Sequence, residues 1–148
     1  MGGGGLPPPP VVLGSCTGSD TQPNAILSME ATLYERYDET RYIEVYWNAG
    51  GCLGYNEDPD YIVTSCNLTV KSMVSWPVIT PPGGDPGYPD PIVHEIDGCM
   101  ASNTDVFEVI PADYYIIEVT LNVGCWFVFK LIVPGYDSDS ASCSCMID

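Results

Sequence analysis

The chain has 148 residues, of which 20 are acidic and 4 are basic, so its formal net charge is −16 at pH 7. This charge disfavours binding to nucleic-acid phosphates and to anionic membrane surfaces, and no apolar run is long enough for a transmembrane helix. Hydrophobic residues make up 45% of the chain, which excludes an acidic disordered tail and indicates one packed, β-rich domain.

Residues 1–13 are rich in glycine and proline. A polyproline II segment is stiff and extended, so it does not form a core by itself but can lie along another surface. We therefore expect an extended N-terminal arm that contacts a partner through Pro7, Pro8, Pro9 and Pro10. The alternative is a leader without fixed structure. The arm lacks the basic and apolar regions of a secretory signal.

Residues 14–24 are polar, and we expect a connecting segment there. The next residues, Ile26–Arg36, alternate between apolar and polar side chains and predict a strand. A short polar connection leads to a second alternating segment, Arg41–Trp47. Together the two segments predict a β-hairpin.

Three aromatic side chains fall on the expected outer face of this hairpin, namely Tyr34, Tyr42 and Tyr46. Aromatic rings with polar tips can stack on sugar rings or pack against a protein neighbour. The alternative is ordinary cross-strand packing of β-favouring residues.

Residues 55–60 form an acidic, turn-rich loop. Asp58 and Asp60 carry the oxygen ligands that calcium prefers, but they do not continue into a calcium-loop pattern, so solvated turns are the alternative. Alternation in Tyr61–Trp76 then predicts one or two strands that end before Pro77.

Residues 77–91 contain six prolines and three glycines, a density that excludes a central strand. A loop of this length is usually functional or disordered. We expect an exposed loop that contacts a partner through Pro81, Pro82 and Tyr88.

Two further short strands are expected at Ile92–Ile96 and Asp105–Ile110. Residues 114–133 predict two long strands folded back on each other at a two-residue turn beginning with Gly124. The expected outer face of the second strand is apolar at Trp126 and Val128, which suggests a cover from a neighbouring strand or a partner subunit.

These seven or eight strands predict an all-β chain that forms a single antiparallel β-sandwich or jelly-roll-like domain. We expect this domain to span residues 14–136, between the arm (1–13) and a polar, cysteine-containing tail (137–148) without periodicity.

The seven cysteines include no Cys-x-x-Cys pair, so disulfides are favoured over a zinc ribbon: Cys16, Cys52, Cys66, Cys99, Cys125, Cys143 and Cys145. The odd number leaves at least one thiol outside intramolecular pairs, and the connectivity stays open. Disulfides are typical of oxidising compartments. A phage structural protein oxidised after lysis and a secreted protein whose signal has been removed both fit this composition.

His94 and Glu95 are adjacent, but neighbouring residues of a strand point to opposite faces and do not form a catalytic pair. We therefore expect a non-enzymatic structural or assembly protein without a cofactor, unless calcium binds. The best-fitting role is a virion (phage) decoration or capsid-associated subunit, or a comparable extracellular assembly subunit. Its partners would be further copies of itself or a capsid lattice, in a virion or outside the cell.

The alternative from the sequence is a secreted carbohydrate-binding or adhesion module that uses the three outward tyrosines, with or without calcium. A small hydrolase with an acidic site is a third and weaker alternative, since any of the 20 acidic residues would have to be chosen without a motif.

Overall fold

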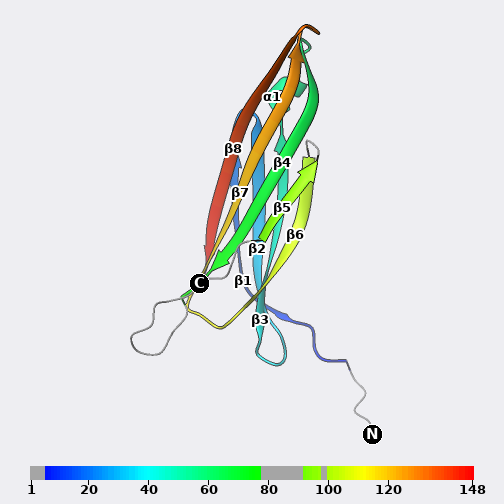
Figure 1. Cartoon of the computed structure of the whole chain (residues 1–148). Coiled ribbons are helices and arrows are strands. Elements are labelled where there is room, and N and C mark those ends of the chain that lie inside the picture. Colours follow the sequence, from blue (N-terminus) through cyan, green and yellow to red (C-terminus); the bar gives the residue numbers. More distant parts are fainter. Residues whose placement is uncertain (1–5, 78–91, 98–99) are drawn as a thin grey trace.

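The computed structural model describes residues 6–77, 92–97 and 100–148. The chain forms two four-stranded antiparallel sheets that pack face to face, which confirms the predicted all-β sandwich (Figure 1). In the part of the chain described, no helix is long and apolar enough to cross a membrane. The elements in chain order are β1 (Val11–Thr21), β2 (Ala25–Glu35), β3 (Arg41–Gly51), α1 (Leu53–Asn56), β4 (Tyr61–Ser75), β5 (Ile92–Asp97), β6 (Met100–Val109), β7 (Tyr115–Phe129) and β8 (Val133–Ile147).

The strand order distinguishes between the two architectures expected from the sequence. The first sheet has the order β1-β2-β3-β6 and the second β5-β4-β7-β8. Strands β2 to β8 therefore follow the connectivity of immunoglobulin-like sandwiches, in which strands A, B and E face strands C′, C, F and G. Strand β1 is an addition at the edge of the first sheet. A fold of this kind carries no function by itself.

Two internal contacts match this connectivity. The buried ring of Tyr115, at the start of β7, donates its hydroxyl to the Ile110 carbonyl at 2.7 Å and accepts the Ala112 N–H at 3.1 Å. This contact resembles the tyrosine corner of immunoglobulin-like domains, although the residue two positions after the tyrosine is Ile117 and not a cysteine. A disulfide between Cys52, just after β3, and Cys125 on β7 joins the two sheets.

The core lies between the sheets and is formed by alternate residues of the central strands, among them Ile43, Trp47, Leu68 and Leu121. A buried carboxylate, Asp105 of β6, sits in this core, accepting bonds from the Trp47 indole N–H at 3.3 Å and from the Ser72 hydroxyl. Because these groups come from both sheets, the polar contact helps fix how the sheets pack.

One long edge of the sandwich is closed by β1 and β8, which belong to different sheets. The Cys16–Cys145 disulfide joins these strands, and the Ser142 N–H donates to Asp20 Oδ2 at 3.0 Å. Covering two edge strands with each other makes their edges less accessible to unwanted strand pairing.

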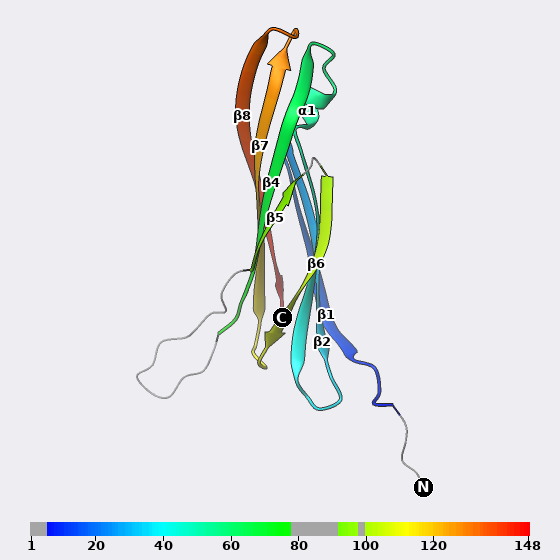
Figure 2. The same ribbon diagram turned by 45° about the vertical axis from the view of Figure 1, so that its right-hand side comes forward.

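Strands β4, β7 and β8 extend beyond the first sheet at one end of the molecule (Figures 1 and 2). Helix α1 lies under this extension. Tyr55 of α1 stacks on Phe127 with ring centroids 4.4 Å apart, and Tyr61 meets the same ring edge-on at 5.2 Å. The helix thus supplies the inner cover that the first sheet does not provide there.

The predicted turn at Gly124 is wrong, because β7 runs through it as one strand and the chain turns after Phe129. Gly124 pairs with Asn67 of β4 and with Ser138 of β8, so the ladder is continuous on both sides. The inward positions also keep one phase across the glycine, with Val123 and Cys125 both buried. The residues that flank a two-residue turn lie on the same face of a hairpin. Such a turn would therefore have moved the inward positions from odd to even residue numbers.

The segments expected as polar connection and polar tail are also strands, since 14–21 belongs to β1 and 137–147 to β8. These strands approach too closely for large inward side chains: a Cβ at Gly14 would lie 2.8 Å from Ile147 Cγ2. Small residues carry no hydrophobic periodicity, so the strands were missed. The predicted β2–β3 hairpin is confirmed. Of the one or two strands expected over Tyr61–Trp76, the structure has one, β4.

Candidate functional site

The outer face of β4, β7 and β8 changes from apolar to polar along the strands. Four successive cross-strand rows, beginning at the extended end, are Ile62–Val128–Pro134, Ser65–Trp126–Tyr136, Asn67–Gly124–Ser138 and Thr69–Asn122–Ser140. Directly opposed side chains of antiparallel strands lie about 4.5–5.5 Å apart, so each row acts as one continuous strip.

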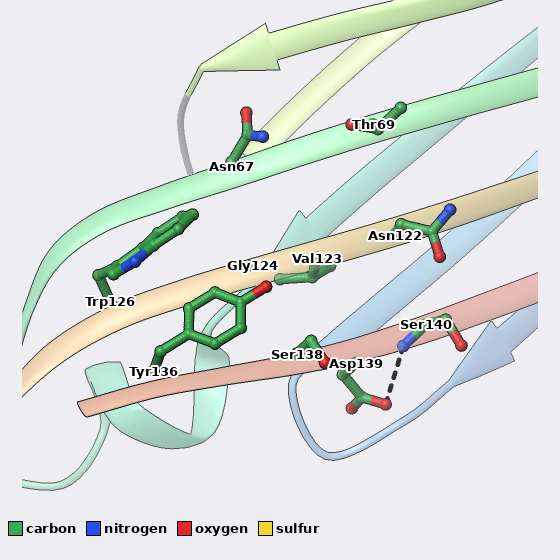
Figure 3. A pocket seen from close by; sticks show the side chains of 10 residues that line it. All are labelled: Asn67, Thr69, Asn122, Val123, Gly124, Trp126, Tyr136, Ser138, Asp139 and Ser140. Atoms are coloured by element: carbon green, nitrogen blue, oxygen red, sulfur yellow. Dashed lines mark hydrogen bonds between the residues drawn. The ribbon is translucent and has the colours of Figure 1, made fainter.

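A shallow depression of about 430 Å³ covers the polar rows and is bounded by the aromatic row (Figure 3). We call it the hollow. It is lined by Asn67, Thr69, Asn122, Val123, Gly124, Trp126, Tyr136, Ser138, Asp139 and Ser140.

Trp126 and Tyr136 form the aromatic wall of the hollow. Their side chains are 42% and 56% exposed, and their ring centroids lie 4.7 Å apart. Gly124 lets both rings lie over the strand, because a Cβ there would be 3.2 Å from Tyr136 Oη and 3.3 Å from Trp126 Cζ3. Covering a strand glycine with aromatic rings is also a known way to stabilise a sheet.

The carboxylate of Asp139 is fixed at the rim of the hollow. Its Oδ2 accepts the Asn24 N–H at 2.9 Å. Its Oδ1 accepts the Ser140 N–H at 2.9 Å (Figure 3). The rest of the polar lining consists of amide and hydroxyl groups. Chemically, an aromatic wall next to amides and hydroxyls suits a neutral, hydroxyl-rich ligand.

Beyond the aromatic wall several apolar side chains are exposed or half-buried, beside the exposed Lys130. We call Ile62, Val128, Leu131, Ile132 and Val133 the apolar tip. Leu131 is 75% and Ile132 is 81% exposed, at the turn between β7 and β8. Clustered apolar side chains in water are typical of interaction surfaces.

The backbone of this turn is unfavourable for its residues. The Phe129 carbonyl accepts the Ile132 N–H at 3.1 Å, and between them Lys130 and Leu131 have φ values of 50° and 63°. Two successive left-handed residues in a hairpin turn favour Asn-Gly. Other residues cost roughly 1–2 kcal/mol each in this conformation.

Tyr34 and Tyr42, predicted as ligand contacts, pack against each other on the outer face of the first sheet. Their rings stack with centroids 5.0 Å apart, and the Arg36 guanidinium lies 4.4 Å above the Tyr42 ring. This is the cross-strand packing named as the alternative. Tyr46 lies in a separate depression beside β1, so the three tyrosines do not share one site.

Trp126 and Val128, predicted as partner contacts, lie where the hollow meets the apolar tip; Trp126 is exposed and Val128 is half-buried. The exposed prolines at 7–10 precede β1 at the opposite end of the molecule (Figure 2). Pro81, Pro82 and Tyr88 lie outside the described residues.

Asp58 and Asp60 form a local turn, in which Asp58 Oδ1 accepts the Asp60 N–H at 2.9 Å. Among the histidine, cysteine and acidic side chains that the structure describes, the group close enough to share a metal ion is instead Cys52, Cys66 and Cys125. Whether calcium binds at residues 58–60 stays a prediction.

Two disulfides, Cys16–Cys145 and Cys52–Cys125, show the connectivity that the sequence left open. Cys66 is buried beside the second disulfide, and Cys99 lies outside the described residues. Cys143 is half-buried, and burial, with a smaller contribution from Asp20, raises the pKa of its thiol to about 11.

Sequence reasoning missed Tyr136 and the polar lining of the hollow, because it placed β8 outside the sandwich and a turn at Gly124. The unbroken alternation from Ile117 to Phe129 was the signal that would have identified one strand with a single outer face. Comparison of the chain with family models, curated proteins and solved structures finds no match.

Proposed function

We propose that this chain is a non-enzymatic assembly subunit that associates with further copies of itself through the apolar tip. The role that fits best is a virion decoration or capsid-associated subunit, or a comparable extracellular assembly subunit. The observation that carries the proposal is the turn after β7, where bulky residues occupy left-handed backbone positions and expose apolar side chains.

Both features of this turn are costly for an isolated domain. An Asn-Gly turn would relieve the backbone, and polar side chains would suit the exposed positions better. Local strain of this kind is concentrated at functional sites. The cost is understandable if the exposed side chains of Leu131 and Ile132 become buried against a partner.

The charges near the tip favour a second copy as this partner. Lys130, one of only four basic residues, is exposed at the turn, and its N–H donates to the Asp60 carbonyl at 2.7 Å. The backbone of Lys130 therefore adjoins the acidic segment 57–60, while its ammonium lies 5.3 Å from the centroid of the Phe129 ring. In a two-fold contact each copy can place Lys130 against the acidic segment of the other, which makes the surface self-complementary.

The remaining surface charge and the disulfides support an extracellular or virion setting. A net charge of −16 limits unspecific aggregation outside the tip. Two disulfides in a small domain are typical of proteins that function in an oxidising environment.

The test replaces the turn with the sequence that its backbone prefers, Lys130→Asn together with Leu131→Gly. We expect the free energy of unfolding to rise by about 1–2 kcal/mol, because relief of the strain at two positions is partly offset by the greater freedom of glycine in the unfolded chain. At the same time self-association should be lost. Light scattering coupled to size-exclusion chromatography measures the mass, and urea denaturation measures stability.

Val106→Thr is the matched control, since Val106 is an exposed apolar residue on the other sheet and should leave the mass unchanged. A wild-type chain that stays monomeric at high concentration, or a turn variant that associates as before, would count against assembly through the tip.

A second candidate function, binding of a neutral carbohydrate, is favoured by one specific observation. Gly124 leaves room for the Trp126–Tyr136 wall directly beside the amides and hydroxyls of the hollow. The carbohydrate candidate proposed here therefore uses the hollow of the second sheet, whereas the sequence suggested the tyrosines of the first.

Isothermal titration with neutral cello-, chito-, manno- and xylo-oligosaccharides tests this second function. Binding that is lost in Trp126→Ala and kept in Tyr46→Ala would support the hollow, since Tyr46 is an exposed aromatic residue on the other sheet. The absence of heat with all four sugars would remove this candidate.

A further inference from the structure

The polar outer face of the second sheet continues past the hollow. The next two cross-strand rows of β4, β7 and β8 are Lys71–Thr120–Ser142 and Met73–Glu118–Ser144. A second depression of about 330 Å³ lies over these rows, and it is lined by Glu118, Thr120, Ser142, Cys143 and Ser144. The hollow ends at the row Thr69–Asn122–Ser140, so the two depressions follow one another along β7 and β8 without an intervening row.

The amide and hydroxyl side chains of both depressions are available to a ligand. Within the described part of the chain, hydrogen bonds to other protein groups are absent from the side chains of Asn67, Thr69, Thr120, Asn122, Ser138, Ser140, Ser142 and Ser144. Ser138, Ser140 and Ser142 donate to aspartate carboxylates, but through their backbone N–H groups. Because each hydroxyl or amide can both donate and accept, this face can exchange hydrogen bonds with the hydroxyl groups of a sugar.

The two depressions and the aromatic wall form a long surface. Along β7 the outward residues run from Trp126 to Glu118, because the odd-numbered residues between them are buried, namely Val119, Leu121, Val123 and Cys125. Eight residue steps of about 3.4 Å give this surface a length of about 27 Å. A single sugar ring would contact only part of this length, whereas an extended chain of sugar units would contact all of it.

The orientation of the aromatic wall favours a single chain over a flat polymer surface. The ring planes of Trp126 and Tyr136 are inclined to each other by 49°. A flat crystalline surface cannot lie on two rings that do not share a plane. One sugar ring of a flexible chain, in contrast, can stack on either of them.

Charge restricts the ligand to a neutral chain. Glu118 lines the second depression, Asp139 lies at the rim of the hollow, and the formal net charge of the protein is −16. Lys71, which is paired with Thr120, balances only part of this charge. Carboxylate or sulfate groups on a polysaccharide would therefore be repelled.

We propose that the hollow and the second depression form one elongated site for an extended segment of a neutral polysaccharide. This inference rests on the second candidate function, carbohydrate binding at the hollow, and specifies its ligand. One sugar unit stacks on the wall formed by Trp126 and Tyr136, and the units that follow lie along β7 as far as Glu118. These units exchange hydrogen bonds with the amides and hydroxyls of both depressions.

Isothermal titration of the full chain with oligosaccharides of increasing length tests the elongated site. The probes are the neutral cello-, chito-, manno- and xylo-series, each from the disaccharide to the hexasaccharide. For a series that binds, the affinity should rise roughly tenfold from the shortest to the longest member, which is the effect of one or two additional hydrogen bonds. Acidic oligogalacturonides should give no heat, because their carboxylates are repelled.

Thr120→Arg fills the second depression, three rows away from the aromatic wall. Its affinity for the hexasaccharide should fall to that of the wild type for the disaccharide, while its affinity for the disaccharide stays unchanged. Thr32→Arg is the matched control and should bind the hexasaccharide as the wild type does, since Thr32 is a half-buried threonine on an inner strand of the other sheet. Circular dichroism checks that the variants fold, and Ser142→Arg, at an exposed position of β8, tests the same depression if Thr120→Arg does not fold.

The outcomes separate this inference from the function on which it rests. Equal affinity for short and long oligosaccharides would overturn the elongated site but leave carbohydrate binding at the hollow. Hexasaccharide binding that is unchanged in Thr120→Arg or Ser142→Arg would do the same. Binding of oligogalacturonides would contradict a neutral ligand, and the absence of heat with every probe would remove the carbohydrate function and the elongated site together.

Discussion

The two ends of strand β7 are built in opposite ways. At its first residue, Tyr115 is buried and its hydroxyl bonds to two backbone groups. Two residues further on, Ile117 is paired with Cys145, which carries the disulfide to β1. At its last residues the same strand extends past the first sheet and ends in a strained turn with exposed apolar side chains.

This contrast separates stability from interaction along a single strand. The anchored end satisfies its polar groups internally and joins both sheets, so substitutions there should change the free energy of unfolding. The exposed side chains of the turn that follows the distal end, Leu131 and Ile132, contribute little to the isolated domain. If the contrast is correct, changes at Tyr115 and at the Cys16–Cys145 disulfide should lower the free energy of unfolding more than changes of the exposed turn residues Leu131 and Ile132.

The largest loss of stability is expected when the disulfide at the anchored end is removed. Replacing both Cys16 and Cys145 with serine removes a bridge between residues 129 positions apart. Loss of such a cross-link from a small domain typically costs about 2–5 kcal/mol, because the unfolded chain gains freedom. Urea denaturation of the double variant measures this loss directly.

Cys143→Ser is the control for this prediction, since Cys143 lies on the same strand but in neither of the two disulfides. Its substitution should cost less than about 1 kcal/mol. Equal losses in the two variants would mean that the bridge adds no stability beyond local packing.

The next effect concerns the tyrosine corner. Tyr115→Phe keeps the buried ring but leaves the Ile110 carbonyl and the Ala112 N–H without this partner. We expect a loss of about 1–3 kcal/mol, the cost of a partly buried group that loses its hydrogen bond. Tyr114→Phe changes the exposed neighbour and should stay within about 0.5 kcal/mol. A similar loss in both variants would contradict an anchoring role for Tyr115.

A smaller and pH-dependent effect is expected near the distal end, at Tyr55 of α1. Its hydroxyl donates to Asp137 Oδ2 at 2.7 Å, and this bond raises the pKa of Tyr55 to about 12 from an ordinary value of 10.0. A raised pKa means that the stabilising contribution is complete below about pH 10 and is lost as the pH rises through about 12.

Absorbance at 295 nm during alkaline titration measures this ionisation. Asp137→Asn removes the acceptor charge and should return the pKa of Tyr55 toward 10, while Tyr55→Phe should remove the late-titrating group. The free energy involved is expected to be below about 1 kcal/mol, because water competes for an exposed contact. A Tyr55 titration unchanged by Asp137→Asn would show that another cause raises its pKa.

The fold was predictable from the sequence wherever large side chains alternate. The inward residues of β2, β3 and β4, such as Leu27, Val45 and Leu68, are hydrophobic and buried, and these strands were predicted correctly. Strand β1 could not be found in this way, because its inward positions include Gly14 and Gly18, which allow close approach to β8. Close packing of two strands removes the periodicity on which such predictions depend.

The site was predictable only in part, for a related reason. The apolar outer face at Trp126 and Val128 is visible in the sequence, since it interrupts the expected polar side of a strand. The cross-strand partners of Trp126 are Ser65 of β4 and Tyr136 of β8, and both depend on strand registers that the sequence does not show. The group of three core cysteines likewise depends on long-range register, because disulfide connectivity does not follow from cysteine spacing.

The smallest effect is expected at the turn itself, where the contrast between the two ends is tested most directly. Ile132→Ser replaces an apolar side chain that is 81% exposed and does not change the turn residues with positive φ. Measured at dilution, where copies do not associate, its free energy of unfolding should lie within about 0.5 kcal/mol of the wild type. The same variant at high concentration should associate more weakly. A loss of stability as large as that of Tyr115→Phe would mean that Ile132 packs within its own domain, and the two ends of β7 would then not differ in the way the exposure of their side chains indicates.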